Sequence, residues 1–385
     1  MRITFFSNFF NVHQLPLALE FYAMEQVDYT FISLLATDGI VGRSSLDGKY
    51  DFVLKEYESE KSSELAMQHA LEDEIVVFGD MAGKEGYVRA RAKTGKPFFR
   101  YAERILKRGD WWRFVPPKIC RTWNRFGRYR NSNMRVLCAG AYTARDLSMF
   151  GFPVKKCLKW GYFPQTQGGH GNDNSKLSLP RYKALCSAQR LIPWKRVELQ
   201  LHALKRVKGD GFDATLTIAG DGPERQKLED LAGELELSDC VTFVGELSHK
   251  ETLALMSRCG IFLATSDRNE GWGATINEAM GMGCCVIASE EMGSVPFLID
   301  DGFNGLSFRC DDVPAASEKI EQALSDADLI RRLGDRAKKT VDGIWSAERS
   351  ASRFAELASA VLSEETASLD DIQPWPDGPL SSAGI

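Results

Sequence analysis

Short apolar runs alternate with longer stretches of helical periodicity along the whole chain. In the first half the runs lie near residues 3–7, 29–35, 52–56, 75–78, 97–100, 136–139 and 157–160. In the second half they lie near residues 184–188, 215–219, 241–244, 261–264, 285–288 and 306–308. Strands that alternate with helices predict an α/β protein with parallel sheets covered on both faces. We expect helices to begin near Pro223, Ser248, Thr275 and Val313.

A polar, glycine-rich stretch divides the chain. Residues 166–176 lack apolar periodicity, which predicts a linker, and a hinge if the two halves close on a ligand. We therefore predict one domain over residues 1–165 and a second over residues 177–345. Residues 346–362 have the pattern of a helix. Residues 363–385 are acidic and rich in Pro and Ser, and we expect a disordered tail.

Composition fits a two-domain protein in a reducing compartment. The 385 residues are 44% hydrophobic and 26% charged, and the formal charge of -5 argues against nucleic-acid binding as the main function. The nine cysteines show no Cys-x-x-Cys spacing and the five histidines are scattered, so we predict small core cysteines and no metal site. The first residues enter an apolar strand at once, and no stretch approaches the roughly 20 apolar residues of a membrane span. We expect a cytoplasmic protein.

One segment has a strong local charge. Residues 104–135 contain ten Lys or Arg and one acid, a formal charge of +9, with six aromatic residues interleaved. Such a segment is typical of contact with an anionic membrane surface, here the inner face of the membrane. It is also compatible with a solvated helix face with some buried tryptophans, or with a site for an anionic acceptor.

Glu270 and Glu278 are separated by seven residues and a glycine-broken loop. Because the loop begins a helix and Glu278 falls about one turn into it, both carboxylates can face one ligand. The glycines allow close approach of backbone N–H groups, which suits a diphosphate, while carboxylates accept sugar hydroxyls. The alternative is a solvated loop acid and a favourable first-turn charge. The donor-binding candidates here are Gly271, Trp272, Gly273, Ala274, Thr275 and Glu278.

Two cations lie on a second predicted loop. Arg190 and Lys195 stand on the short connection that follows the strand near residues 184–188. Ligands bind at such connections in open α/β sheets, and two cations there would meet the charge of a diphosphate.

Together with three further segments, these residues resemble family 4 glycosyltransferases of the GT-B fold over residues 183–308. The segments are IAGDGPE at 218–224, VTFVG at 241–245 and IDDGFNG at 299–305. Over residues 1–165 the chain more loosely resembles a bacterial polysaccharide subgroup, through segments 7–14, 100–104 and 159–164. In place of the glycine pair that many members carry, this chain has His13 and Gln14. Where the family often has Pro-Glu, it has Pro296-Phe297, so no acid is assigned there.

The resemblance implies two Rossmann-like, doubly wound domains facing a cleft, with a C-terminal helix crossing back to the first domain. It implies transfer of a hexose from a nucleoside diphosphate sugar to a hydroxyl of a glycan or lipid-linked acceptor, with retention and without metal or cofactor. Glu270 would hold donor-sugar hydroxyls and Glu278 the ribose. Arg190 and Lys195 would stabilise the leaving diphosphate. The base would meet the backbone near Val244 to Leu247.

Candidates on the acceptor side are His13, Gln14, Glu103 and Arg104. His13 is equally explained as a loop hydrogen-bonding residue, and Glu103 by an ion pair with Arg100 or Lys107.

Two other functions remain open. A nucleotide-sugar epimerase would use the same fold and donor site without an acceptor. A non-catalytic nucleotide-sugar-binding protein would be expected to lose Glu270, Arg190 or Lys195, and all three are present.

Overall fold

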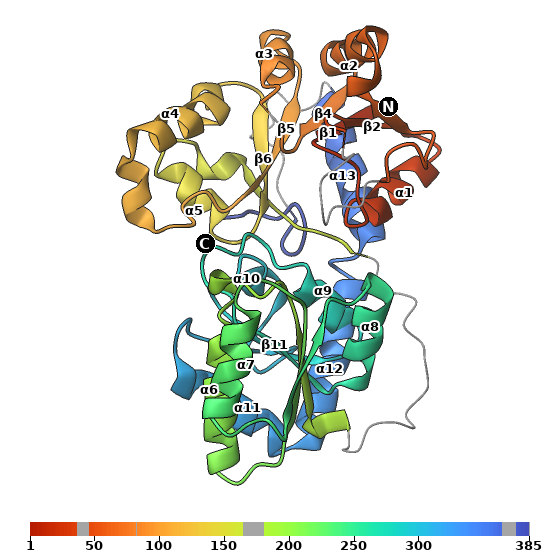
Figure 1. The fold of residues 1–385 in the computed structure, drawn as a ribbon. Coiled ribbons are helices and arrows are strands. Elements are labelled where there is room, and N and C mark those ends of the chain that lie inside the picture. Colours follow the sequence, from red (N-terminus) through yellow and green to blue (C-terminus); the bar gives the residue numbers. More distant parts are fainter. Residues whose placement is uncertain (37–45, 82, 165–180, 364–374, 385) are drawn as a thin grey trace. The chain divides into compact units, whose positions relative to one another are not determined.

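The computed structural model describes residues 1–36, 46–81, 83–164, 181–363 and 375–384. The chain forms two compact units (Figure 1). Unit 1 comprises residues 1–164 and 345–385, and unit 2 comprises residues 165–344. The predicted linker, residues 166–176, lies outside the described residues.

The described strands of unit 1 form a seven-stranded parallel sheet in the order β3-β2-β1-β4-β5-β6-β7. Each lies at one of the apolar runs predicted from the sequence. The strands are β1 (Arg2–Ser7), β2 (Asp28–Ser33), β3 (Val53–Lys55), β4 (Ile75–Phe78), β5 (Phe98–Glu103), β6 (Met134–Ala139) and β7 (Cys157–Trp160).

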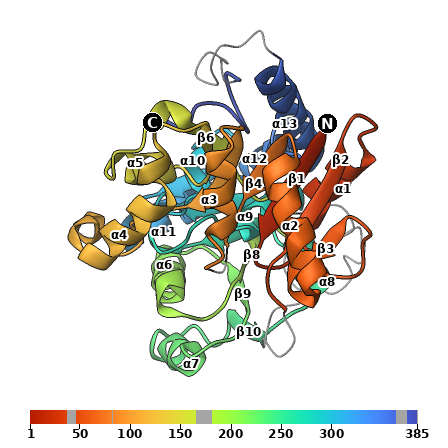
Figure 2. The ribbon, with the colours of Figure 1, turned by 90° about the horizontal axis from the view of Figure 1, so that it is seen from above.

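Helices cover both faces of this sheet. Successive residues of a strand point to opposite faces, so the side chains of Phe5 and Phe6 lie on the two faces of the sheet. The ring of Phe6 lies 5.4 Å from Tyr87 of α3, while Phe5 lies 5.4 Å from Phe21 of α1. Helices α2 and α3 lie side by side (Figure 2). The helices of unit 1 are α1 (Leu15–Ala23), α2 (Glu60–Glu72), α3 (Gly86–Lys93), α4 (Pro116–Arg125), α5 (Thr143–Ser148) and α13 (Ala347–Leu362).

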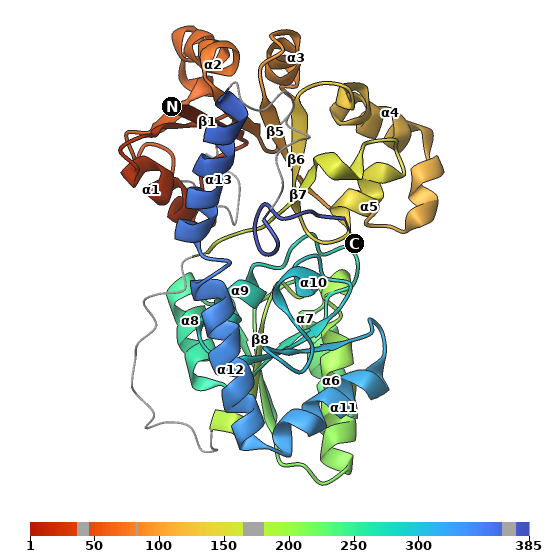
Figure 3. The same ribbon diagram turned by 180° about the vertical axis from the view of Figure 1, so that it is seen from behind.

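The last helix, α13, returns to unit 1 and packs beside α1 (Figure 3). Phe354 anchors it, because its ring contacts those of Phe5, Phe21 and Phe99 at 5.8, 5.6 and 5.1 Å. The expectation of a C-terminal helix that crosses back to the first domain is confirmed.

The prediction of a disordered tail from residue 363 was wrong for residues 375–384. Ser382 forms an antiparallel bridge with Leu158 of β7, and Leu380 is fully buried. The buried guanidinium of Arg353, on α13, donates to the carbonyl oxygens of Asp377 and Pro379 at 2.6 and 3.1 Å. The polar composition of this segment did not predict these contacts, because backbone groups make most of them.

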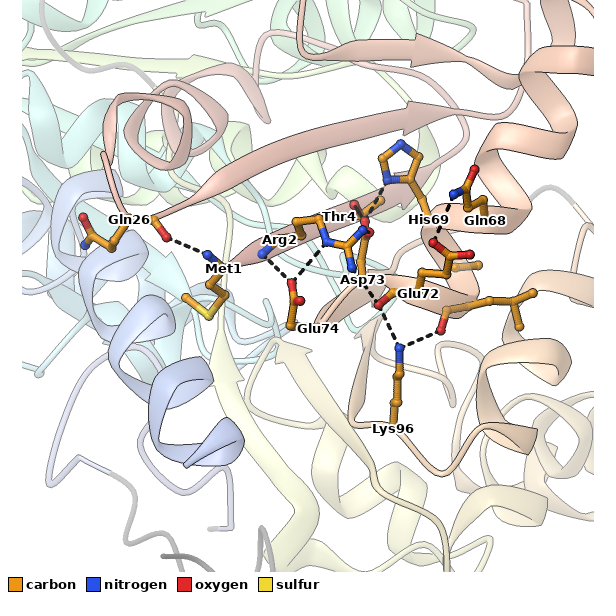
Figure 4. A network of polar contacts seen from close by, with 12 residues as sticks. Met1, Arg2, Thr4, Gln26, Gln68, His69, Glu72, Asp73, Glu74 and Lys96 are labelled. Carbon is orange, nitrogen blue, oxygen red and sulfur yellow. Dashed lines mark hydrogen bonds and ion pairs between the residues drawn. The ribbon is translucent and has the colours of Figure 1, made fainter. Parts of the chain in front are cut away.

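A polar network fixes the start of β1 to the end of α2 (Figure 4). Asp73 is buried and accepts hydrogen bonds from Thr4 and from His69 Nδ1, the latter at 2.8 Å. Arg2 adds an ion pair to Asp73 at 3.3 Å and a backbone hydrogen bond to Glu74 at 2.7 Å. Asp73 ends α2 and Glu74 precedes β4, so the network joins a helix and two strands.

Unit 2 contains a six-stranded parallel sheet among its described residues, in the order β10-β9-β8-β11-β12-β13. Every predicted strand of the second half is present. The strands are β8 (Ala184–Ala188), β9 (Thr215–Ala219), β10 (Val241–Gly245), β11 (Ile261–Ala264), β12 (Cys285–Ser289) and β13 (Leu306–Phe308).

The helices of unit 2 pack in two groups, with α6 against α7 and α11, and α9 against α8 and α12 (Figures 1 and 3). Helices begin as expected at Thr275 and Val313, and Ser248 caps α8. Near Pro223 the helix begins two residues later, because Pro223 and Glu224 lie in a turn in which Arg225 N–H donates to the carbonyl oxygen of Gly222 at 3.1 Å. The helices are α6 (Val197–Gly209), α7 (Arg225–Glu234), α8 (His249–Arg258), α9 (Thr275–Gly281), α10 (Val295–Leu298), α11 (Val313–Leu324) and α12 (Ala327–Asp342).

Candidate functional site

The strand order of unit 2 defines where a ligand is expected. Numbered along the chain, the strands follow the order 3-2-1-4-5-6, so connections leave in opposite directions after β8 and β11. Ligands of open α/β sheets bind at this switch point, beyond the carboxyl ends of the strands. Residues 189–196 follow β8 and residues 265–274 follow β11. The predicted residues Arg190, Lys195 and Glu270 therefore stand on the two connections that flank the switch point.

Direct hydrogen bonds join these two connections. The N–H of Asp267 donates to the carbonyl oxygen of Trp194 at 2.9 Å. The hydroxyl of Thr265 donates to the carbonyl oxygen of Lys195 at 2.9 Å. The amide of Gln200, which is fully buried, donates in turn to the Thr265 hydroxyl at 2.9 Å. The backbone around Lys195 is thus fixed to the connection that carries Glu270.

Lys195 Nζ forms an ion pair with Glu270 Oε2. Their side chains are 17% and 16% exposed, so both groups are largely withdrawn from solvent and still reach the surface. Because Lys195 compensates the charge of Glu270, the carboxylate does not by itself repel an anionic ligand. Arg190 is exposed on the same connection, and its side chain has no ion pair among the described residues.

The loop after β9 supports this arrangement. Leu191 N–H donates to the carbonyl oxygen of Asp221 at 2.9 Å, and Glu224 N–H donates to that of Leu191 at 3.0 Å. Gly220 has a φ of +125°, and a Cβ atom there would overlap the carbonyl oxygen of Gln189. Glycine in the IAGDGPE segment is therefore required by close packing against the connection that carries Arg190.

The glycine-broken loop before α9 also requires glycine at one position. Gly273 has a φ of +88°, and a Cβ atom would lie 2.6 Å from Met292 Cε and 3.5 Å from Glu270 Cγ. Trp272 is buried, and its indole N–H donates to Asn277 Oδ1 at 2.8 Å, so the side chain anchors the loop. Ala274 and Thr275 are partly exposed at the start of α9.

Glu278 is buried on α9 and pairs with a residue that the sequence analysis did not select. Its Oε1 lies 3.2 Å from Nε2 of His249, the first residue of α8. The hydrogen bond and charge of Glu278 raise the pKa of His249 more than partial burial lowers it. Leu247, two residues earlier, is partly exposed on the connection after β10. The position of His249 after a strand end was a signal that could have identified it.

Unit 1 contains a cavity of about 580 Å³ at the carboxyl end of its sheet. All four acceptor-side candidates, His13, Gln14, Glu103 and Arg104, line it. The side-chain oxygen of Gln14 accepts from the N–H of Asn11 at 3.0 Å, so Gln14 also closes the turn after β1.

Glu103 and Arg104 have defined partners. Glu103 accepts from Lys107 at 3.0 Å and from the hydroxyl of Tyr162 at 3.0 Å. Of the two partners considered for Glu103, Lys107 is thus the one observed, because Arg100 is fully buried and forms two hydrogen bonds with Glu85, at 2.7 and 2.9 Å. The buried guanidinium of Arg104 lies 4.2 Å from the ring centroid of Tyr142.

The comparisons agree with this architecture. Residues 172–340 match the model for the family of glycosyl transferases group 1. N-acetyl-alpha-D-glucosaminyl L-malate synthase of Bacillus anthracis is 28% identical over 171 residues, 44% of each chain, so the match spans less than half of that relative. Lipopolysaccharide core biosynthesis glycosyltransferase LpsE of Rhizobium meliloti is 29% identical over 70% of this chain and 74% of its own. The crystal structure of Anabaena HepE in complex with UDP aligns with a TM-score of 0.71 at 16% identity, covering 94% of this chain and all of HepE. The fold is GT-B.

Within this GT-B protein, the basic segment 104–135 does not form one surface. Lys118, Arg121 and Arg125 of α4 line the cavity of unit 1, whereas Arg135 is buried. The exposed aromatic side chains Trp111, Phe114 and Trp123 lie between or beside these cations in sequence. Charge and aromatic content do not show which helix face turns inward, so the sequence alone predicted a single basic segment.

The described residues of this GT-B chain contain neither a metal-binding cluster nor a membrane-spanning helix. No group of three or more His, Cys, Asp or Glu side chains there is arranged to hold a metal ion. No helix in the same residues has the length and apolar character needed to cross a membrane.

Proposed function

We propose that the protein is a family 4 glycosyltransferase that moves a hexose from a nucleoside diphosphate sugar to a hydroxyl of a glycan or lipid-linked acceptor, with retention at the anomeric carbon. The observation that carries this proposal is the pairing of Lys195 with Glu270 at the switch point of unit 2. That pair lies inside the segment that matches the glycosyl transferases group 1 model.

The chemistry of transfer explains why a cation and a carboxylate belong together there. As the bond to the sugar breaks, negative charge develops on the leaving diphosphate, and Lys195 and Arg190 are the cations on the adjoining connection. Glu270 accepts hydroxyls of the donor sugar, and this contact frees Lys195 to face the diphosphate. The backbone of residues 273–275 adds donors. The cationic side chains meet the diphosphate charge, so the proposed reaction uses no metal and no cofactor.

The remaining roles follow from position. Glu278 accepts the ribose hydroxyls, and His249 holds one of its oxygens in place. The base meets the backbone near residues 244–247. A departing phosphate oxygen takes the proton of the acceptor hydroxyl, so no protein nucleophile is needed. His13, Gln14, Glu103 and Arg104 contact the acceptor in the cavity of unit 1.

Known proteins support the ligand class. The structures of Anabaena HepE contain UDP, UDP and glucose, or UDP-glucose. The name of LpsE refers to lipopolysaccharide core biosynthesis, and a role in polysaccharide biosynthesis is proposed here by likeness. We also propose a cytoplasmic location with peripheral contact to the inner face of the membrane, through exposed aromatic side chains of segment 104–135.

A binding screen followed by product analysis tests the proposal. Uridine, guanosine and adenosine diphosphate sugars are added separately, and a ligand at 100 times its Kd should stabilise the fold by about 2.7 kcal/mol. The best donor is then incubated with and without a glycan acceptor. Acceptor-dependent product that retains the anomeric configuration supports the transferase. An epimerised donor formed without acceptor would identify an epimerase, and binding without product would identify a binding protein.

A further inference from the structure

Helix α4 turns one continuous cationic face toward the cavity of unit 1. Lys118, Arg121, Thr122 and Arg125 all line the cavity, and their spacing of three, four and seven residues places them on one side of the helix. Ile119 and Trp123 lie on another side and are 41% and 42% exposed. The helix thus separates its cations from its apolar side chains, and the cations face the space available to a ligand.

The charges around the cavity do not balance. Five Lys or Arg side chains line it, against two acids, Asp80 and Glu103. Glu103 is already paired with Lys107 at 3.0 Å. Arg125 lies 3.4 Å from Glu85 and 4.0 Å from Asp80, so it is compensated within the protein.

Lys118 and Arg121 are the uncompensated pair. Among the described residues, neither side chain has an ion pair or a hydrogen bond, and Lys118 Nζ lies 4.5 Å from the ring centroid of Trp112. Burial and the charge of Arg121 lower the pKa of Lys118 to about 8. The charge of Asp146 favours the ammonium form in part, and an anion bound beside Lys118 and Arg121 would stabilise it further.

We propose that the cationic face of α4 binds a phosphate group carried by the acceptor, with Lys118 and Arg121 as its charge partners and Arg125 as a flanking donor. Two uncompensated cations match the charge of a phosphate ester, which is about -1.5 to -2 at pH 7, better than the single charge of a carboxylate. The same cavity is lined by Trp112, Phe126 and Trp160, so an apolar group attached to the phosphate finds contacts there.

This inference rests on the proposed function, because the bound phosphate compound is an acceptor only if the protein is a transferase. The phosphate site itself lies wholly in unit 1. The phosphate belongs either to a lipid carrier or to a soluble phosphorylated sugar. Both sources present the same group to Lys118 and Arg121, and the experiment must distinguish them.

The test measures binding of three probes to the full chain by calorimetry at low salt: inorganic phosphate, a hexose 6-phosphate and a short-chain polyprenyl phosphate. The double variant Lys118→Gln/Arg121→Gln should weaken binding of the preferred organic phosphate by about tenfold or more, since charge-assisted hydrogen bonds are lost. The matched control Arg128→Gln/Arg130→Gln removes the same charge from exposed residues that do not line the cavity, and should change the affinity less than twofold. Glutamine removes the charge and keeps a polar, unbranched side chain, and thermal unfolding verifies the fold of each variant.

The organic probe that binds more tightly than inorganic phosphate identifies the source of the phosphate. Tighter binding of polyprenyl phosphate indicates a lipid carrier, and tighter binding of hexose 6-phosphate indicates a soluble sugar. Equal affinity for all three probes, or an affinity that the cavity variant does not reduce more than the control, would overturn the proposal. The Lys195→Ala variant separates the two hypotheses, because it should lose donor binding or turnover in unit 2 and keep the phosphate affinity of unit 1. Failure of every nucleotide sugar to bind would reject the proposed function and leave the phosphate measurement valid.

Discussion

His249 Nε2 lies 3.2 Å from Glu278 Oε1, and this contact joins the first turns of α8 and α9. The carboxylate proposed to hold a ribose is therefore already oriented by a titratable group. Glu278 is buried and His249 is partly exposed, and the carboxylate raises the pKa of the imidazole.

The first prediction concerns pH. Glu278 raises the pKa of His249 in the folded state above its unfolded value of about 6.5. The pair therefore stabilises the fold fully below pH of about 6.5, and this stabilisation is lost as the pH rises through the raised pKa. Unfolding free energies of wild type and His249→Gln should differ most at acidic pH and converge at alkaline pH. A constant difference across that window would exclude the linkage.

The second prediction concerns Glu278 itself. Its carboxylate is expected to accept ribose hydroxyls in both the ground state and the transition state. Glu278→Ala should weaken the binding of donor and nucleoside diphosphate by about 1.5 to 3 kcal/mol, the range for hydrogen bonds to a charged group. Calorimetry on a variant that remains folded checks this value. An unchanged affinity would remove Glu278 from the donor site.

The third prediction concerns Lys195, whose charge should matter more as the diphosphate leaves than while the donor is bound. Lys195→Ala should lower kcat by about 100- to 1,000-fold, as is typical for a lost transition-state donor, with a smaller loss of donor affinity. Glu270 loses its ion-pair partner in this variant, so Lys195→Arg serves as a control that keeps the charge. A loss confined to KM, with kcat preserved, would mean that Lys195 only binds the donor.

The sequence predicted the strands well because buried parallel strands are short apolar runs. Ile75–Phe78 is buried at every position, and its pattern requires no knowledge of distant contacts. The connections that carry Lys195 and Glu270 followed from strand ends and from motif likeness. These features depend on residues that are close together in the sequence, so they can be predicted without knowing which distant residues meet in the fold.

Long-range pairing could not be predicted in the same way. Arg100 was one of two equivalent partners for Glu103, and only the structure shows that it binds Glu85, fifteen residues earlier. The hydrogen bonds of residues 375–384 to β7 and α13 involve backbone groups, which leave no trace in composition. Which face of α4 turns inward depends on the cavity that other elements create.

The fourth prediction concerns acid stability. Although burial opposes ionisation of Asp73, the hydrogen bonds from His69 and Thr4 and the charge of Arg2 outweigh it and lower the pKa of its carboxyl. Its contribution is therefore present above the unfolded pKa of about 3.9 and is lost as the pH falls through the lower folded value. Asp73→Asn should cost about 1 to 3 kcal/mol at neutral pH. Urea unfolding should show that this cost shrinks in acid, and a cost independent of pH would contradict the role of the charge.

The last prediction concerns membrane contact. Trp111 and Phe114 are 60% and 68% exposed, and both stand in a 3-10 segment, Asp110–Phe114, immediately before α4. The guanidinium of Arg113 lies 4.7 Å from the ring centroid of Phe114, so a cation accompanies this exposed aromatic side chain. Each cation near an anionic bilayer adds roughly 1 kcal/mol, and this attraction fades within a Debye length of about 8 Å at physiological ionic strength.

We therefore expect the protein to co-sediment with anionic vesicles and not with neutral ones, and to be released largely at high salt. Trp111→Ser/Phe114→Ser should abolish the fraction that resists salt, because these side chains supply the apolar contact. Tyr22→Ser, which alters an exposed aromatic residue on α1, is the control and should bind as wild type. Substituting Arg121 or Arg125 would be a poorer test, since both line the cavity and serve a different proposal. If the wild type ignores anionic vesicles at low salt, or if the double variant binds as before, the exposed aromatics have no membrane role.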